Sequence, residues 1–291
     1  MSHRVSRGTA LLAFALLFPV VLPAQTGDGA SRYATLNGAR IHYQSWGKGT
    51  EALVLVHGWS QSLDSWRDNI PELAQRNRVV ALDLPGHGAS DKPQVAYSMA
   101  YFAGAVRAVM RAAGVQRAVL AGHSMGTPVV RQFYRKYPAQ TLALIIVDGP
   151  LEPFGDPKML QGLITGLKSP GYKEVGGAML AQLTGPNLPP EVLGRVRTQM
   201  QATPQHVLAS AMEGLADSTI WTRDQIKVPV LAILAKRPQY PPDLEQRMRL
   251  IGPKLEFVIW DDVGHFLMME QPKRFDQVVL GFLDKNGLLK R

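Results

Sequence analysis

Residues 122–126 read Gly-His-Ser-Met-Gly, directly after the apolar run 118–121 and shortly before a helix-like stretch at 129–137. In this order of strand, Gly-x-Ser-x-Gly and helix, the serine sits in a strained turn with its hydroxyl clear of the backbone. The chain passes so close to itself at such a turn that only hydrogen fits at Gly122 and Gly126. The motif alone occurs often by chance, so its surroundings decide its meaning.

Strand-like and helix-like segments alternate along most of the chain. Asn37-Gly38 predicts the turn of a β-hairpin. Strands are predicted at 33–36, 39–46, 52–56, 78–82, 116–121, 142–147, 228–235 and 255–260, and helices at 63–75, 98–113, 125–137, 241–251 and 272–286. This alternation indicates an α/β fold with a mostly parallel sheet covered on both faces.

The alternation stops between residues 150 and 221, where short helix-like pieces such as 191–200 and 204–216 replace strands. We interpret 150–221 as a helical insertion above the carboxyl edge of the sheet, where open α/β folds bind ligands. The core would then consist of residues 25–149 and 222–291.

The first 24 residues resemble a secretory signal peptide. Arg4 and Arg7 precede an apolar segment, 11–22, and Pro23-Ala24 offers a cleavage site before Gln25. The apolar segment is short and interrupted by proline for a membrane span. We expect export to the periplasm or the extracellular space and no stable membrane insertion after cleavage, with an uncleaved anchor as the alternative.

Composition narrows the classes of function. The net charge of +9 would fall to +7 on cleavage, because residues 1–24 contain two arginines and no acid. The basic residues are scattered and accompany no nucleic-acid-binding motif, so we expect no nucleic-acid partner. The sequence has no cysteine, which excludes a disulfide framework, a thiol nucleophile and cysteine-ligated metal. It also has no His-x-x-x-His spacing, and we expect no metal.

Four motifs follow predicted strands in a fixed order. They are His-Gly-Trp at 57–59, Asp-Leu-Pro-Gly-His-Gly-Ala-Ser at 83–90, the pentapeptide at 122–126, and Gly-His-Phe at 264–266. With these motifs the chain resembles the α/β-hydrolase superfamily over residues 33–288. The resemblance implies an eight-stranded, mostly parallel sheet flanked by helices, a helical cap at 150–221, and no cofactor.

Two side chains are predicted to carry the chemistry. Ser124 is the candidate nucleophile, and a hydroxyl needs an adjacent base to attack at neutral pH. His265 is the candidate base, because it alone of the seven histidines follows the last strand. The resemblance assigns an oxyanion hole to the backbone N–H groups of Trp59 and Met125.

The remaining histidines receive structural roles or none. His123 would point away from the nucleophile, and His57 and His87 are expected to hold their loops. No partner is evident for His42 or His206.

The third member of a serine triad, the acid, departs from the common pattern. Most relatives carry an aspartate after the strand at 228–235, but here Lys-Arg-Pro-Gln-Tyr follows at 236–240, and the first acid is Asp243. Some relatives place the acid after the preceding strand, where Asp148 stands. We favour Asp148. Asp243 remains an alternative, with Glu245 on the same helix, while Asp261 and Asp262 are expected to shape the His265 loop.

The leading hypothesis is a serine hydrolase that cleaves an ester, lactone or amide of a small molecule through an acyl-enzyme. Haloalkane dehalogenases and epoxide hydrolases of this fold use an aspartate where Ser124 stands. The alternatives are a C–C hydrolase, a lyase or a cofactor-free perhydrolase, because fold and triad do not determine the reaction. A non-catalytic ligand-binding protein is a further alternative, favoured only by the missing acid after 228–235. The substrate and the oligomeric state are not indicated.

Overall fold

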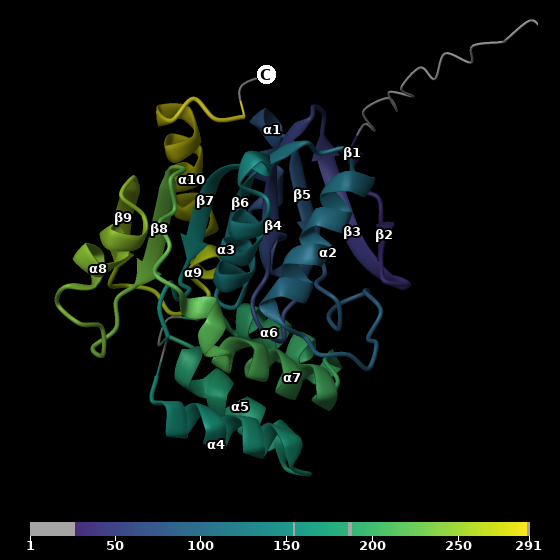
Figure 1. The fold of residues 1–291 in the computed structure, drawn as a ribbon, viewed down its shortest axis with the longest axis vertical. Coiled ribbons are helices and arrows are strands. Elements are labelled where there is room, and N and C mark those ends of the chain that lie inside the picture. The colour runs from purple at the N-terminus through teal and green to yellow at the C-terminus, as the bar shows by residue number, and fades with distance from the viewer. Residues whose placement is uncertain (1–26, 154, 186–187, 290–291) are drawn as a thin grey trace, which may run out of the picture.

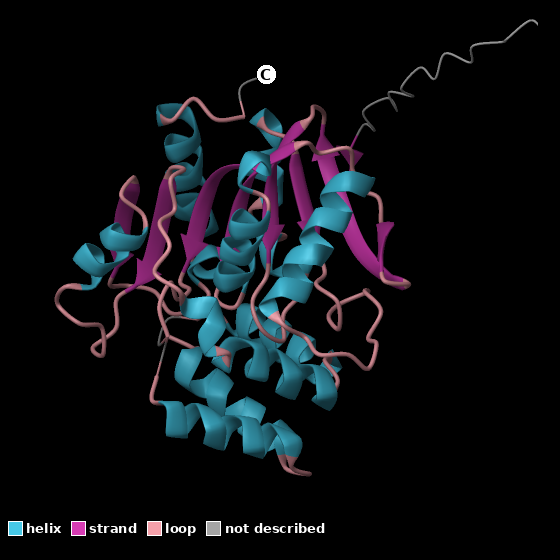
Figure 2. Ribbon diagram, viewed as in Figure 1, coloured by secondary structure: helices cyan, strands magenta, loops and turns pink. Residues whose placement is uncertain are grey.

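A computed structural model describes residues 27–153, 155–185 and 188–289 of the chain. The predicted signal peptide, residues 1–24, lies outside the described residues. A twisted sheet crosses the molecule with helices on both faces, and a separate group of helices lies at one end of the strands (Figures 1 and 2). The strands are β1 (Gly27–Asp28), β2 (Arg32–Leu36), β3 (Ala39–Gly47), β4 (Glu51–Val56), β5 (Val79–Leu82), β6 (Arg117–His123), β7 (Thr141–Val147), β8 (Val230–Ala235) and β9 (Leu255–Trp260).

The sheet is eight strands wide and mostly parallel. Its order is β1-β3-β5-β4-β6-β7-β8-β9, and β2 pairs with β3 next to β1. The short β1 pairs with Trp46 and Gly47, whereas β2 pairs with the first half of β3, so the two share one edge of that strand. All neighbouring pairs from β5 to β9 are parallel. The predicted fold class is therefore confirmed.

The hairpin of β2 and β3 turns at the Asn-Gly pair that the sequence singled out. Asn37 and Gly38 have φ of 49° and 85°, the left-handed backbone that a tight two-residue hairpin turn requires. Leu36 pairs directly with Ala39 across this turn.

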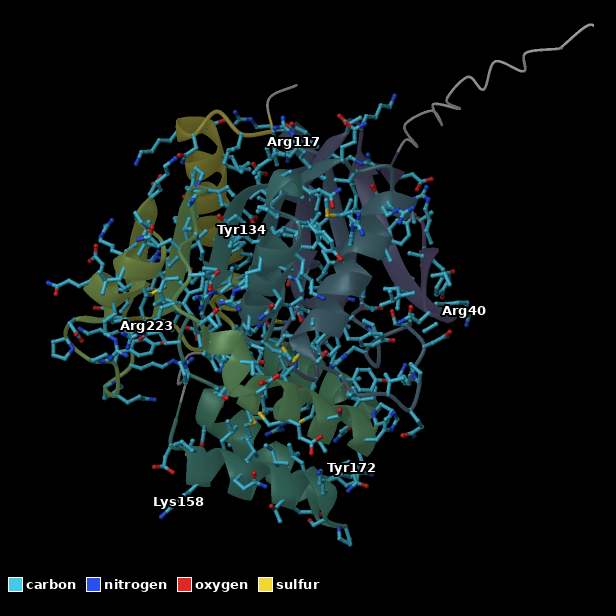
Figure 3. All side chains as sticks on the ribbon, in the orientation of Figure 1. Arg40, Arg117, Tyr134, Lys158, Tyr172 and Arg223 are labelled. Carbon is cyan, nitrogen blue, oxygen red and sulfur yellow. The ribbon has the colours of Figure 1, made fainter. Side chains whose placement is uncertain are left out.

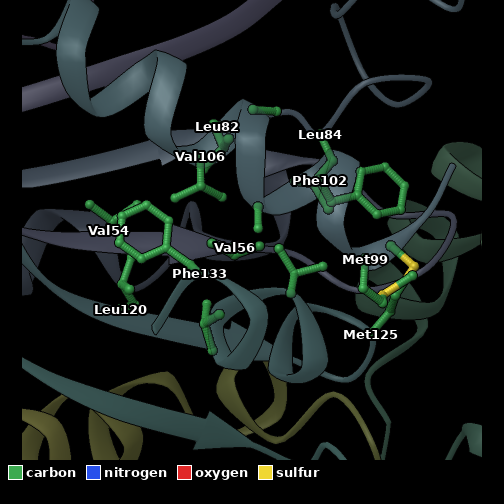
Figure 4. Close-up of a cluster of buried hydrophobic side chains, with 14 of the residues drawn as sticks. Val54, Val56, Leu82, Leu84, Met99, Phe102, Val106, Leu120, Met125 and Phe133 are labelled. Carbon is green, nitrogen blue, oxygen red and sulfur yellow. The ribbon is translucent and has the colours of Figure 1, made fainter. Parts of the chain in front are cut away.

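Helices bury both faces of the sheet, which explains why the central strands are apolar throughout. Every residue of β4 after Glu51 is buried. Val54 and Val56 pack in the cluster shown in Figure 4, together with side chains of α2 (Met99–Ala112) and α3 (Gly126–Lys136). The alternate residues of β4 face a second cluster, made with α1 (Ile70–Arg76), α9 (Leu267–Glu270) and α10 (Pro272–Lys285).

The helix predicted at 63–75 is wrong as a single element. The chain forms a short 3₁₀ helix, η1 (Leu63–Trp66), and then α1, with Pro71 in its first turn. A proline inside one continuous helix would lack a hydrogen bond and clash with the preceding turn, whereas the first turn tolerates it.

The segment between β7 and β8 is helical in its described part. It contains α4 (Pro157–Lys168), α5 (Tyr172–Leu183), α6 (Pro190–Ala202), α7 (Gln205–Ala216) and η3 (Ser218–Trp221). Helices α4 to α7 lie below the arrowheads of the central strands in Figure 1, and we refer to them as the cap. In the described ranges, no helix combines the length and apolarity needed to cross a membrane.

Hydrogen bonds tie the cap to the core along α7. The Trp59 indole Nε1 donates to the Leu208 carbonyl at 2.9 Å, and the Tyr97 backbone N–H donates to Ser210 Oγ at 3.0 Å. The cap is thus held against the loops that follow the sheet.

Strand order sets the position of the site. β4, β6, β7, β8 and β9 are adjacent and parallel, so the residues that follow them share one edge of the sheet. Residues 57–59, Ser124, Asp148, residues 236–240 and His265 all follow these strands.

Candidate functional site

The turn after β6 holds Ser124 in a strained conformation. Its φ is +53°, in the left-handed region that side chains other than glycine rarely adopt. A Cβ atom added to Gly122 would lie 2.3 Å from the Gly126 carbonyl oxygen, and one added to Gly126 would lie 2.5 Å from that of Val56. The close approach expected from the two glycines is therefore present. Ser124 is partly exposed, while Met125 on one side and His123 on the other are buried.

Ser124 and His265 line the same small cavity under the cap. The cavity has a volume of about 20 Å³. The core supplies Gly58, Trp59, Ser60, Gln61, His123, Ser124, His265 and Phe266, and the cap supplies Met179, Leu180, Leu183 and Met200. This volume is close to that of one water molecule, so a substrate needs adjoining space.

A groove of about 270 Å³ between α5 and α6 adjoins this cavity. Leu180 and Met200 line both spaces and stand between them. Tyr172, which Figure 3 labels on the cap, lines the groove near the start of α5. The groove is open to solvent along Gly177 and Arg197, both of which are exposed.

Three contacts hold the loop that carries His265. The His265 backbone N–H donates to the Leu183 carbonyl at 3.2 Å, which joins the loop to the end of α5. The Glu270 carboxylate accepts the Gly264 N–H at 2.9 Å. His123 Nε2 donates to the His265 carbonyl at 2.9 Å. Burial lowers the pKa of His123 to about 3, so this ring is neutral and serves as a brace.

Asp148 lies directly after β7 and faces His265. Its Oδ2 is 2.6 Å from His265 Nδ1, and its Oδ1 accepts the Ala235 backbone N–H at 2.9 Å. The φ of Asp148 is +44°, a left-handed conformation that aspartate tolerates better than most residues. Burial alone would raise the pKa of Asp148, but the His265 hydrogen bond, the Arg237 charge and the Ala235 N–H together hold it below its usual value.

This pairing determines the histidine tautomer. An ionised carboxylate only accepts hydrogen bonds, so the proton of the neutral ring is on Nδ1. His265 Nε2 is then the nitrogen with a free lone pair. Both side chains are almost fully buried, which shields the pair from water.

The other acids considered from the sequence lie elsewhere. Asp243 is the residue before α8 (Leu244–Ile251), and Glu245 pairs with Arg249 one turn along that helix. Asp262 pairs with Arg274 on α10. Among the described residues, the carboxylate that bonds to His265 is that of Asp148.

Sequence reasoning missed Arg237. Its guanidinium forms an ion pair with Asp148 Oδ2, and its Nη2 lies 3.0 Å from His265 Nδ1. A signal was present in the sequence, since Lys236-Arg237 occupies the place after β8 where an acid was sought.

The sequence assigned the two oxyanion-hole donors to Trp59 and Met125. Trp59 lines the cavity, and Met125 follows Ser124 directly as the residue before α3. Within the described chain no backbone hydrogen bond occupies either N–H group. The Trp59 indole packs under the cap through its bond to Leu208.

The other loop histidines are structural. His57 Nδ1 donates to the Gly58 carbonyl at 2.8 Å, and its Nε2 accepts the Leu84 N–H at 2.9 Å, which links the loops after β4 and β5. Burial lowers the pKa of His57 and lowers that of His87 to about 3. His42, for which the sequence suggested no partner, lies 2.8 Å from Asp83 Oδ2.

In the described ranges, no group of three or more histidine, cysteine or acidic residues is arranged to hold a metal ion. Asp83 instead organises its loop by accepting the backbone N–H groups of Leu63 and Ala89.

The amino-acid sequence is similar to those of proteins with named functions. Over 266 residues it is 27% identical to a 2-hydroxy-6-oxononadienedioate/2-hydroxy-6-oxononatrienedioate hydrolase of Paraburkholderia phymatum, covering 84% of this chain and 91% of that protein. It is 37% identical over 118 residues to a dihydrolipoyllysine-residue acetyltransferase component of the acetoin cleaving system of Cupriavidus necator. That match covers 40% of this chain and only 32% of that protein.

A thermophilic esterase of Thermogutta terrifontis has a similar structure, with a TM-score of 0.79 and 25% identity over 88% of this chain and 99% of the esterase. The family model for the alpha/beta hydrolase fold matches residues 51–272, a span that contains Ser124, Asp148 and His265. With this match, the sheet order and the serine turn after β6, the chain belongs to the α/β-hydrolase family.

Proposed function

We propose that the protein is a serine hydrolase that cleaves a carboxylic ester of a small molecule through an acyl-enzyme on Ser124. The observation that carries the proposal is the buried Asp148–His265 pair, 2.6 Å apart, at the cavity that Ser124 also lines. Similarity to an esterase and to other hydrolases supports the same class of reaction.

Each group has a defined task in this mechanism. His265 Nε2 takes the proton of Ser124 as the hydroxyl attacks the ester carbonyl. The carbonyl oxygen becomes an oxyanion, which the N–H groups of Trp59 and Met125 stabilise. Asp148 holds the imidazole orientation and stabilises the imidazolium that forms.

Collapse of the tetrahedral intermediate breaks the ester bond. The leaving alkoxide takes the proton from His265, and the acyl group stays on Ser124. Water then gives a proton to His265 as it attacks the acyl-enzyme, and a second collapse returns that proton to Ser124 and releases the carboxylic acid. Lactones and amides would follow the same course.

C–C bond hydrolysis is the second candidate, and the similarity to the Paraburkholderia phymatum hydrolase favours it. A ligand-binding protein without turnover is less favoured. Its one supporting feature was the lack of an acid after β8. We propose that Asp148, which follows the neighbouring strand β7 and is hydrogen-bonded to His265, takes the role of that acid.

The test is hydrolysis of p-nitrophenyl acetate, butyrate and octanoate by the purified protein and by Ser124→Ala. We expect turnover by the wild type and a loss of several orders of magnitude in the variant. Ser60→Ala removes another serine hydroxyl that lines the cavity, so it shows whether the loss is specific to Ser124. Equal turnover in wild type and Ser124→Ala would reject the proposal.

A further inference from the structure

Arg237 lies in the loop after β8, next to the loops that carry Asp148 and His265. β8 lies between β7, which leads to Asp148, and β9, which leads to His265. The chain leaves β8 at Ala235, so Arg237 follows the central one of these three strands. A side chain here reaches both partners at once.

The contacts of Arg237 concentrate on the bond between acid and histidine. Nη2 donates to Asp148 Oδ2, the same oxygen that His265 Nδ1 approaches at 2.6 Å. Nη2 is also 3.0 Å from His265 Nδ1 itself. The Asp148 side chain is fully buried, and that of Arg237 is 22% exposed. Water therefore screens this charge cluster only weakly.

The guanidinium has two effects of the same sign on the imidazole. It donates a hydrogen bond to Asp148 Oδ2, the oxygen that also accepts the proton of His265 Nδ1. This competition weakens the hydrogen bond between the carboxylate and the imidazole. The guanidinium also places a positive charge beside a ring that would become positive on protonation, and like charges in contact disfavour the charged form. At the same time it anchors the carboxylate, whose other oxygen is held by the Ala235 N–H.

We propose that Arg237 is a positioning residue that holds the Asp148 carboxylate toward His265 and, through its charge, opposes protonation of the imidazole. The inference concerns the site of the proposed function, in which neutral His265 is the base. The acid that pairs with His265 thus follows β7. Arg237 follows β8, where the sequence led us to expect an acid.

Tyr240, His123 and Glu270 are other titratable groups close to the Asp148–His265 pair. Tyr240 follows Arg237 in the same loop, and burial, with the charge of Asp148, raises its pKa to about 12, so it stays neutral. His123 approaches from β6, with ring centroids 4.7 Å apart, and is neutral above its pKa of about 3. Glu270 on α9 approaches through Gly264, and burial raises its pKa.

The experiment is an NMR titration of His265 in protein labelled on histidine, which requires no turnover. The His265 signal is assigned by its absence in His265→Gln. We expect the titration midpoint in Arg237→Gln to rise by about one pH unit relative to wild type, within the range that one neighbouring charge produces. Arg237→Lys restores the charge and should return the midpoint most of the way.

Lys236→Gln is the matched control, because it removes the same charge from the exposed neighbouring residue. Its midpoint should stay within a few tenths of a unit, since exposed charges are screened. Glu270→Gln identifies any part of the titration curve that Glu270 contributes. Arg237→Met, which keeps an unbranched apolar stem, replaces Arg237→Gln if that variant does not fold.

An unchanged or lowered midpoint in Arg237→Gln overturns the inference, as does an equal shift in Lys236→Gln. If the proposed function holds, the acid limb of kcat/KM moves by the same amount, so activity at a pH below the limb falls about tenfold. A shifted midpoint without esterase activity would uphold the role of Arg237 and reject the proposed reaction.

Discussion

At the level of single residues, Asp148 is the acid that we propose for the triad, because it is hydrogen-bonded to His265. Asp148→Asn should lower kcat by about four orders of magnitude, because an amide in this place favours the wrong tautomer of the histidine. Asp243→Asn should change kcat less than about threefold, since Asp243 lies before α8 and away from the pair. Steady-state kinetics on p-nitrophenyl butyrate gives both values.

Asp148→Asn also removes the partner of a largely buried guanidinium, so each variant needs a thermal unfolding curve beside its kinetics. A folded Asp148→Asn protein with nearly full activity, together with an inactive Asp243→Asn protein, would transfer the role to Asp243.

At the scale of elements, α5 and α6 determine how much space a substrate finds beside Ser124. Leu180 and Met200 separate the small cavity from the groove of about 270 Å³. Met200→Ala should open this passage and raise kcat/KM for the octanoate ester relative to the acetate by about tenfold, a typical gain for accommodating a few methylenes. The ratio of the two kcat/KM values is the measurement.

Met159→Ala is the control for this change, because Met159 is 59% exposed on α4 and lines neither space.

Gly177→Phe makes the groove smaller, whereas Met200→Ala makes the passage to it larger. A Cβ at Gly177 meets nothing within 4 Å, so the variant should fold and narrow the groove. Chain-length preferences that do not respond to either change would show that substrates enter by another route.

At the scale of the whole molecule, export remains a proposal that rests on residues 1–24. Cleavage after Ala24 predicts a mature protein that begins at Gln25 and has lost two positive charges. Intact mass and amino-terminal sequencing of the protein from its native host would measure this. A terminus near Met1 would contradict export by cleavage and favour the membrane-anchor alternative.

The local features of this protein could be predicted from its sequence. The Asn37-Gly38 turn, the apolar strands and the glycines beside Ser124 follow from short-range rules of backbone geometry and burial. Neighbouring residues alone were therefore enough to predict these features correctly. The prediction of a single helix at 63–75 was wrong because Pro71 was compatible with either an interrupted or a newly started helix.

Which side chains come into contact depends on the packing of strands that are distant in sequence. Asp148 and His265 are 117 residues apart in sequence, and their contact depends on the order of β7, β8 and β9 in the sheet. The same order brings Arg237 into contact with both, and the docking of α5 and α6 limits the space at Ser124. Such contacts result from packing between distant segments, and no local pattern encodes distances of a few ångströms across a sheet edge.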